Sequence, residues 1–211
     1  MNNFFKDLFQ EKIPYPFYIK NREDVVFIHI TKNAGTSLTR CFDFNPVIET
    51  KNLLKHYTAS NILELIGQKK WEEAYKFTIV RNPWDRMLSY YFFRKSKQKK
   101  EFLTHDFTFE QWLIYLDDNK LLGDQKQLGR LQFDWLSIDG VNIDLNQILR
   151  FENLNEDIKL LAKNIDVVDY TFEKINASDR DSDYKFYYNK NTKSIIEKNY
   201  EKDIDYFKYV F

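Results

Sequence analysis

Four residues with phosphate-binding chemistry follow a short apolar segment near the start of the chain. The apolar run of residues 25–30 ends before Lys32, and Gly35, Thr36 and Ser37 then open an amphipathic stretch. This order is typical of a strand, a tight loop and a helix N-terminus, where backbone N–H groups and the helix dipole attract anions. Most turns between a strand and a helix bind nothing, so an ordinary turn is the alternative interpretation.

An arginine stands at a second junction of the same kind. Residues 76–80 read as a buried strand, and Arg81 follows them directly. Asn82 and Pro83 suit the N-cap and the first position of a helix, and Asp85 suits its first turn. Strand ends of this kind form the ligand-facing edge of an open α/β sheet, where a guanidinium offers a rigid fork of donors to a phosphate. The alternative is a structural arginine that pairs with a neighbouring carboxylate.

These junctions need a scaffold of strands that alternate with helices. Hydrophobic patterns and capping signals predict strands at 25–30, 76–80 and about 147–151, and helices at 36–43, 59–67, 84–95, 109–118, 155–163 and 192–206. Such alternation predicts a mostly parallel sheet covered by helices on both faces. We expect a single domain over residues 1–211 with an irregular leader at 1–24. The region 119–146 has no clear periodicity.

Composition restricts the class of ligand. The 211 residues include 32 Lys plus Arg and 32 Asp plus Glu. A chain without net positive charge has no global field for nucleic acid, so an anionic ligand needs a local cluster. The dense basic run at 95–100 is expected to be a solvated helix end, with a substrate patch as the alternative. The single Cys41 excludes an intrachain disulfide, and we expect it to be a small buried residue.

The two junctions together resemble the sulfotransferases that use 3′-phosphoadenosine 5′-phosphosulfate (PAPS). The likeness is to the carbohydrate branch related to the heparan and chondroitin 2-O enzymes. It continues through residues 56–59 and 149–154 to the tail, and so covers nearly the whole chain from residue 25. Thr31 stands where the family usually has proline, and Asn33 where it usually has threonine. The resemblance implies a P-loop-like, three-layer α/β fold with a central, mostly parallel sheet flanked by helices.

The resemblance also implies a division of labour within the site. Lys32 would neutralise charge on the departing 5′-phosphate, and Arg81 and Ser89 would hold the 3′-phosphate. Backbone N–H groups would complete the 5′ cradle over Asn33, Ala34, Gly35, Thr36 and Ser37. A weaker likeness places Asn176, Ser178 and Arg180 near the nucleotide.

A general base is the remaining requirement, and the chain has three histidines. The resemblance implies His56, which lies between the two nucleotide segments, and a structural role in capping the adjacent turn is the alternative. An imidazole titrates near neutrality and can accept a hydroxyl proton. His29 lies in the first strand and is expected to be a core residue, and His105 has no supporting pattern. A carboxylate is the fallback.

The sequence therefore predicts a PAPS-dependent enzyme that transfers a sulfuryl group to a hydroxyl of a carbohydrate or glycoconjugate. The alternatives are a P-loop nucleotide kinase or phosphotransferase and a non-catalytic nucleotide- or polysaccharide-binding protein. The pattern GxxxxGK[ST] is absent and no cluster has metal-ligand spacing, so we expect no metal cofactor. Residues 1–9 are interrupted by charge, and no apolar run approaches the about 20 residues of a spanning helix. We expect a bacterial-type, cytoplasmic protein without a transmembrane segment.

Overall fold

A computed structural model describes residues 15–44, 56–123, 130–172 and 183–211. Its centre is a sheet with the strand order β1-β2-β3-β6, formed by Tyr18–Ile19, Arg22–Ile28, Tyr75–Val80 and Gln147–Arg150. β2 pairs in parallel with β3, and β3 in parallel with β6, whereas β1 is antiparallel to β2. The expected mixed α/β architecture with a mostly parallel sheet is therefore confirmed.

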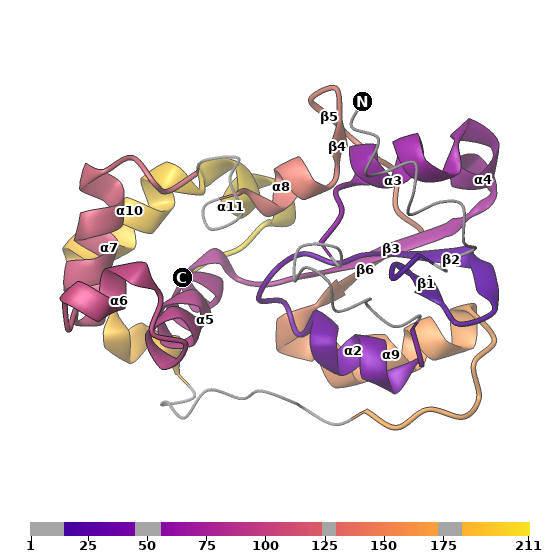
Figure 1. Ribbon diagram of the computed structural model, residues 1–211, viewed down its shortest axis with the longest axis horizontal. Helices are drawn as coiled ribbons and strands as arrows, with labels where there is room; N and C mark the ends of the chain where they lie inside the picture. Colours follow the sequence, from indigo (N-terminus) through magenta and orange to yellow (C-terminus); the bar gives the residue numbers. More distant parts are fainter. Residues whose placement is uncertain (1–14, 45–55, 124–129, 173–182) are drawn as a thin grey trace.

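Helices cover both faces of this sheet, as Figure 1 shows. Alternate residues of β2 enter different apolar clusters: Val25 and Phe27 pack with Leu38 and Leu161, which come from α2 (Gly35–Cys41) and α9 (Leu154–Asn164). Val26 and Ile28 join the opposite cluster, to which α3 (Ala59–Ile66) and α4 (Gln68–Glu73) contribute. Burial on both faces explains why these strands read as continuous apolar runs.

A second group of helices lies beyond the carboxyl ends of the strands, on the left in Figure 1. It consists of α5 (Pro83–Ser96), α6 (Lys100–Thr104), α7 (Phe109–Asp118), α8 (Gln132–Trp135), α10 (Lys190–Asn199) and α11 (Glu201–Phe207). Single 3₁₀ turns, η1 (Phe151–Asn153) and η2 (Tyr184–Tyr187), precede α9 and α10, and a small hairpin joins β4 (Ser137–Ile138) to β5 (Val141–Asn142). These helices place α5 against the end of the sheet.

Side-chain caps set the starts of α5 and α7. Asn82 accepts a hydrogen bond from the backbone N–H of Trp84, with Pro83 in the first position of α5. Thr108 and Gln111 form a reciprocal capping box at the start of α7. Because caps satisfy N–H groups that have no partner within the helix, they set helix starts locally.

Two expectations about the ends of the chain are wrong. Residues 192–206 are not one helix, because the chain breaks at the buried Tyr200 between α10 and α11. The stretch up to residue 24 is not irregular throughout, since β1 occupies Tyr18–Ile19 and β2 already begins at Arg22. The short helices α4, α6 and α8 carry too few residues to show a periodicity and were not predicted.

Candidate functional site

The loop between β2 and α2, residues 29–34, has a strained backbone that turns the chain sharply. We call it the lysine loop. Lys32 and Ala34 both adopt positive φ angles, of 67° and 61°, although neither is a glycine. Left-handed residues of this kind persist only where surrounding contacts hold them. The loop ends at Ala34, and α2 begins at Gly35, three positions after Lys32.

Gly35 is required by the ring of His29. A Cβ atom at position 35 would lie 2.0 Å from Nε2 of His29, a distance at which no real Cβ contact exists. The His29 ring also stacks on Phe27, with ring centroids 5.1 Å apart, and is buried. His29 is therefore a core residue, as expected, and its ring closes one side of the lysine loop.

Three successive loop residues are held by side-chain contacts with other parts of the chain. Arg86 donates from Nε and Nη2 to the carbonyl oxygen and the hydroxyl of Thr31, over 3.2 and 3.3 Å. Arg81 donates from Nη1 to the carbonyl oxygen of Lys32, over 2.9 Å. The amide of Asn33 donates to the carbonyl oxygen of Ile79 and to Oε1 of Gln132, over 2.7 and 2.8 Å. These bonds hold the loop backbone in its left-handed conformation.

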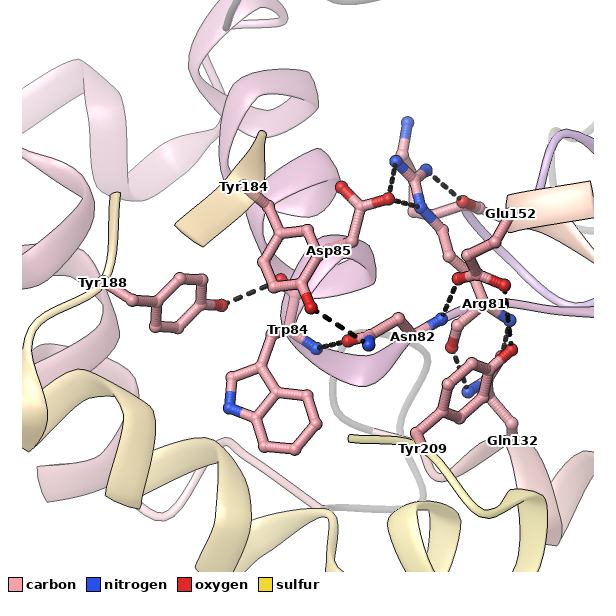
Figure 2. A network of polar contacts seen from close by, with 10 residues as sticks. Arg81, Asn82, Trp84, Asp85, Gln132, Glu152, Tyr184, Tyr188 and Tyr209 are labelled. Atoms are coloured by element: carbon pink, nitrogen blue, oxygen red, sulfur yellow. Dashed lines mark hydrogen bonds and ion pairs between the residues drawn. The ribbon is translucent and has the colours of Figure 1, made fainter. Parts of the chain in front are cut away.

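The sequence leaves two roles open for Arg81, binding a phosphate or pairing with a neighbouring carboxylate. The structure contains the ion pair that the second role requires. Its Nε and Nη2 atoms each lie 2.8 Å from Oδ2 of Asp85, one turn along α5, as Figure 2 shows. The guanidinium also lies over the ring of Phe151, 3.7 Å from its centroid. Arg81 is 5% exposed. These contacts make Arg81 a support of the lysine loop, whereas its contact with a phosphate stays a prediction.

The Lys32 side chain extends along α5. Its ammonium lies 4.2 Å from the ring centroid of Phe93, close enough for a cation–π interaction. Ser89 lies four positions after Asp85 and four before Phe93, and residues four apart share one face of a helix. The α5 face that carries Ser89 is therefore the face that meets the lysine loop and Arg81.

His56 is joined to the same loop. Its Nδ1 lies 3.0 Å from the carbonyl oxygen of His29, and the two imidazole rings are 4.4 Å apart. A carbonyl oxygen can only accept, so Nδ1 carries the proton of this bond and the neutral ring has its lone pair on Nε2. His105 is exposed and stacks on Phe107 just after α6, away from this contact.

Asn82 ties the start of α5 to the C-terminal segment. Its amide nitrogen donates to the carbonyl oxygen of Val210 over 2.9 Å and to the Tyr184 hydroxyl over 3.2 Å. Its backbone N–H donates to Glu152 over 2.6 Å, and the Tyr209 hydroxyl donates to the same carboxylate over 3.2 Å (Figure 2). Burial, and then the Glu152 carboxylate, raise the pKa of Tyr209 and keep its hydroxyl protonated as a donor.

Two buried residues behind the site are Gln132 and Asp203, both 0% exposed. Sequence reasoning missed Gln132, and it included Asp203 only in the tail that resembles the family, without a role in the site. Oε1 of Gln132 accepts from the backbone N–H of Arg81, and its amide nitrogen donates to the Arg81 carbonyl oxygen, over 2.9 and 2.8 Å. Asp203 accepts from the backbone N–H groups of Gln132 and Phe133, over 2.8 Å each. Burial raises the pKa of the Asp203 carboxyl, and the Arg86 guanidinium opposes this rise. Gln132 begins a four-residue helix in the region without periodicity, where no pattern could identify it.

Three of the residues that the resemblance places near the nucleotide have no described position. Asn176, Ser178 and Arg180 lie outside the described residues. In the part of the chain that the structure describes, no three His, Cys, Asp or Glu side chains are grouped as a metal site would need. No helix among the same residues combines the length and apolar composition needed to cross a bilayer.

Comparison with known proteins gives a match to a family model over most of the chain. Searches of curated proteins and of solved structures return no significant relative. The family model described as "Sulfotransferase family" matches residues 15–210, a span that contains both junctions, His56 and the C-terminal segment. Because the match covers nearly the whole chain, the protein belongs to the sulfotransferase family.

Proposed function

We propose that this protein transfers the sulfuryl group of PAPS to a hydroxyl of a carbohydrate-type acceptor. Family membership supports the transfer of a sulfuryl group. The observation that carries the choice of donor is the hydrogen bond between Arg81 and the carbonyl oxygen of Lys32, because it joins the two segments that resemble the 3′- and 5′-phosphate sites. A donor with phosphates at both positions would span this junction. This arrangement is also what a P-loop-like fold would provide.

Lys32 is proposed to stabilise the departing 5′-phosphate. Sulfuryl transfer, like phosphoryl transfer, has a loose in-line transition state in which positioning and charge stabilisation dominate. As the bond from sulfur to the bridging oxygen breaks, negative charge grows on that oxygen, and an ammonium beside it becomes more favourable. The Lys32 ammonium would leave the Phe93 ring, an interaction of only about 0.5–1 kcal/mol at an exposed site, to reach the oxygen. Backbone N–H groups of residues 33–36 would complete the cradle, because the N–H of Ser37 already donates to the carbonyl oxygen of Ala34 over 3.0 Å.

His56 is proposed to take the proton of the acceptor hydroxyl. The His29 carbonyl oxygen engages Nδ1, so Nε2 is the basic nitrogen of the neutral ring. An orienting hydrogen bond on one imidazole nitrogen with proton transfer at the other is a common arrangement for a general base. The His29 ring is itself in contact with Gly35, which places His56 close to the N-terminus of α2.

Arg81 and Ser89 are proposed to hold the 3′-phosphate. Ser89 lies on the α5 face that meets the lysine loop, one turn beyond Asp85. The Arg81 guanidinium would contribute positive charge and hydrogen-bond donors to the 3′-phosphate. Its Nη1 would keep its hydrogen bond to the carbonyl oxygen of Lys32. Asp85 and the 3′-phosphate would then both interact with Arg81. Asp85 would therefore influence how strongly Arg81 binds the phosphate.

The test is sulfate transfer from labelled PAPS across a panel of oligosaccharide acceptors, with Lys32→Ala as the matched inactive variant. We expect label in an oligosaccharide with the wild-type protein, and at least a hundredfold less with the variant if Lys32 supplies on the order of 3 kcal/mol. Transfer that is unchanged in Lys32→Ala would remove Lys32 from the mechanism. PAPS binding without transfer to any acceptor would support the non-catalytic alternative.

A further inference from the structure

The side chain of Gln132 connects the two halves of the candidate donor site. Its Oε1 accepts from Nδ2 of Asn33, in the lysine loop, and from the backbone N–H of Arg81, over 2.8 and 2.9 Å. Its Nε2 donates to the carbonyl oxygen of Arg81 over 2.8 Å. One amide thus bonds both backbone groups of the residue after β3 and a side chain of the loop after β2. Figure 2 shows the contacts with Arg81.

Hydrogen bonding determines the orientation of this amide. Both acceptors of the Asn33 amide nitrogen, Oε1 of Gln132 and the carbonyl oxygen of Ile79, lack a proton to donate. The Arg81 N–H can only donate and the Arg81 carbonyl oxygen can only accept, so neither amide can be flipped without breaking bonds. The arrangement therefore has a single hydrogen-bonded state and sets one distance between the loop and the strand end.

The glutamine is in turn anchored from the C-terminal helices. Its backbone N–H donates to Asp203 over 2.8 Å, and both residues are completely buried. Arg86, also buried, holds Thr31 at the start of the same loop. Buried polar groups are costly to leave without partners, so a network of this kind resists displacement.

We propose that Gln132 is a positioning residue that sets the separation between the 5′- and 3′-phosphate subsites, an inference that rests on the proposed function. A ligand that occupies two subsites at once gains affinity only where their spacing matches its own length. Loss of the Gln132 bonds would let the lysine loop move relative to Arg81. The two-phosphate ligand would then lose this gain, whereas each single-phosphate ligand would still fit its own subsite.

The experiment compares three nucleotides by calorimetry with the wild-type protein and with Gln132→Met, which keeps the length of the side chain and removes its hydrogen bonds. The nucleotides are adenosine 3′,5′-bisphosphate, adenosine 5′-phosphate and adenosine 3′-phosphate. We expect the bisphosphate affinity to fall roughly three- to thirtyfold, and each monophosphate affinity to change by less than about twofold. Asp203→Asn, which weakens the anchor of Gln132, should give the same pattern with a smaller loss.

A control variant separates positioning from loss of stability. Thr108→Ala removes the capping box of α7, outside the candidate site, and should lower the melting temperature while the affinity ratios stay unchanged. Equal losses for all three nucleotides in Gln132→Met would overturn the positioning role and leave the proposed function intact. Absence of a cooperative unfolding transition in both Gln132→Met and Asp203→Asn would also overturn it, because these residues would then be needed for folding itself. A wild-type protein that binds none of the three nucleotides would overturn both proposals.

Discussion

Arg81 donates from Nη1 to the carbonyl oxygen of Lys32 over 2.9 Å, while its Nε and Nη2 atoms engage Asp85. The two residues belong to different junctions of the sheet, β3 to α5 and β2 to α2. The bond means that the side chain expected to meet one phosphate also supports the backbone expected to meet the other. Changes at Arg81 should therefore affect both ends of a bound nucleotide.

Arg81→Ala should weaken binding of adenosine 3′,5′-bisphosphate by about ten- to a hundredfold, because a charge-assisted contact contributes roughly 1.5–3 kcal/mol. Binding of adenosine 5′-phosphate should weaken less, because this ligand would be affected only by the lost hydrogen bond between Arg81 and the lysine loop. The variant should also unfold at a lower temperature, since the buried Asp85 carboxylate would lose its ion pair with Arg81. Calorimetry and thermal unfolding measure these effects.

Arg81→Ala/Asp85→Asn is the control for the stability part of this result. It should recover melting temperature, because the buried carboxylate is gone, but not affinity for the bisphosphate. If Arg81→Ala left bisphosphate affinity unchanged, Arg81 would be a structural residue only.

His56→Asn should separate chemistry from positioning. The amide nitrogen of asparagine can take the place of Nδ1 and donate to the His29 carbonyl oxygen, but nothing replaces Nε2. The variant should fold and bind the bisphosphate normally, and turnover should fall about 10²–10⁴-fold, the usual contribution of a general base. Turnover is measured with an acceptor identified in the panel. Normal turnover would favour a carboxylate as the general base. A lower melting temperature with normal turnover would favour the capping role of His56.

Gly35→Ala should disturb the lysine loop through His29. The added Cβ would overlap the His29 ring, and overpacking of this kind costs about 1–3 kcal/mol of unfolding free energy. Affinity for the bisphosphate should fall as well. His29→Ala makes room for the methyl group, so the double variant should be more stable than the sum of the single effects, as denaturant unfolding would reveal.

Gly67→Ala is the matched control for Gly35→Ala. Gly67 has a φ of 79° at the junction of α3 and α4, and no atom lies within 4 Å of a Cβ placed there. The substitution should destabilise the protein through backbone strain and leave nucleotide affinity unchanged. Additive effects of Gly35→Ala and His29→Ala would show that the ring does not explain the need for glycine.

Nucleotide binding should not need a divalent metal. The sequence lacks the Walker pattern whose Ser or Thr holds Mg²⁺, and the proposed anion site consists of backbone N–H groups, Lys32 and Arg81. Calorimetry in EDTA should therefore give the same affinity for the bisphosphate as in Mg²⁺ buffer, with much weaker binding of ATP. Tight ATP binding that depends on Mg²⁺ would support the kinase alternative.

Cys41 should be unreactive in the folded protein. Burial raises the pKa of its thiol to about 11, and the thiolate is the reactive form. Near pH 8 the folded protein should react with iodoacetamide roughly a hundredfold more slowly than the unfolded chain, whose thiol has a pKa of about 8.5. Mass spectrometry with and without guanidinium measures the two rates, and equal rates would show that Cys41 is accessible.

The sequence by itself determined the elements that carry the site. The apolar runs of β2 and β3, the capping residues Asn82 and Thr108, and the helical period of α5 are local signals, and each was sufficient to locate its element. Parallel pairing followed from the alternation of strands and helices. These features depend on neighbours within a few residues, which is the range over which hydrophobic period and capping act.

Only the tertiary structure decided which partners the site residues have. The Asn33–Gln132 bond joins residues 99 positions apart, and Gln132 comes from a segment without period. Three other features have the same origin. They are the bond from Arg81 to the Lys32 carbonyl oxygen, the His29 ring that excludes a Cβ at Gly35, and the bond from the Gln132 N–H to Asp203. A buried polar side chain takes whichever complementary group the folded chain brings within reach, and no local pattern encodes that group.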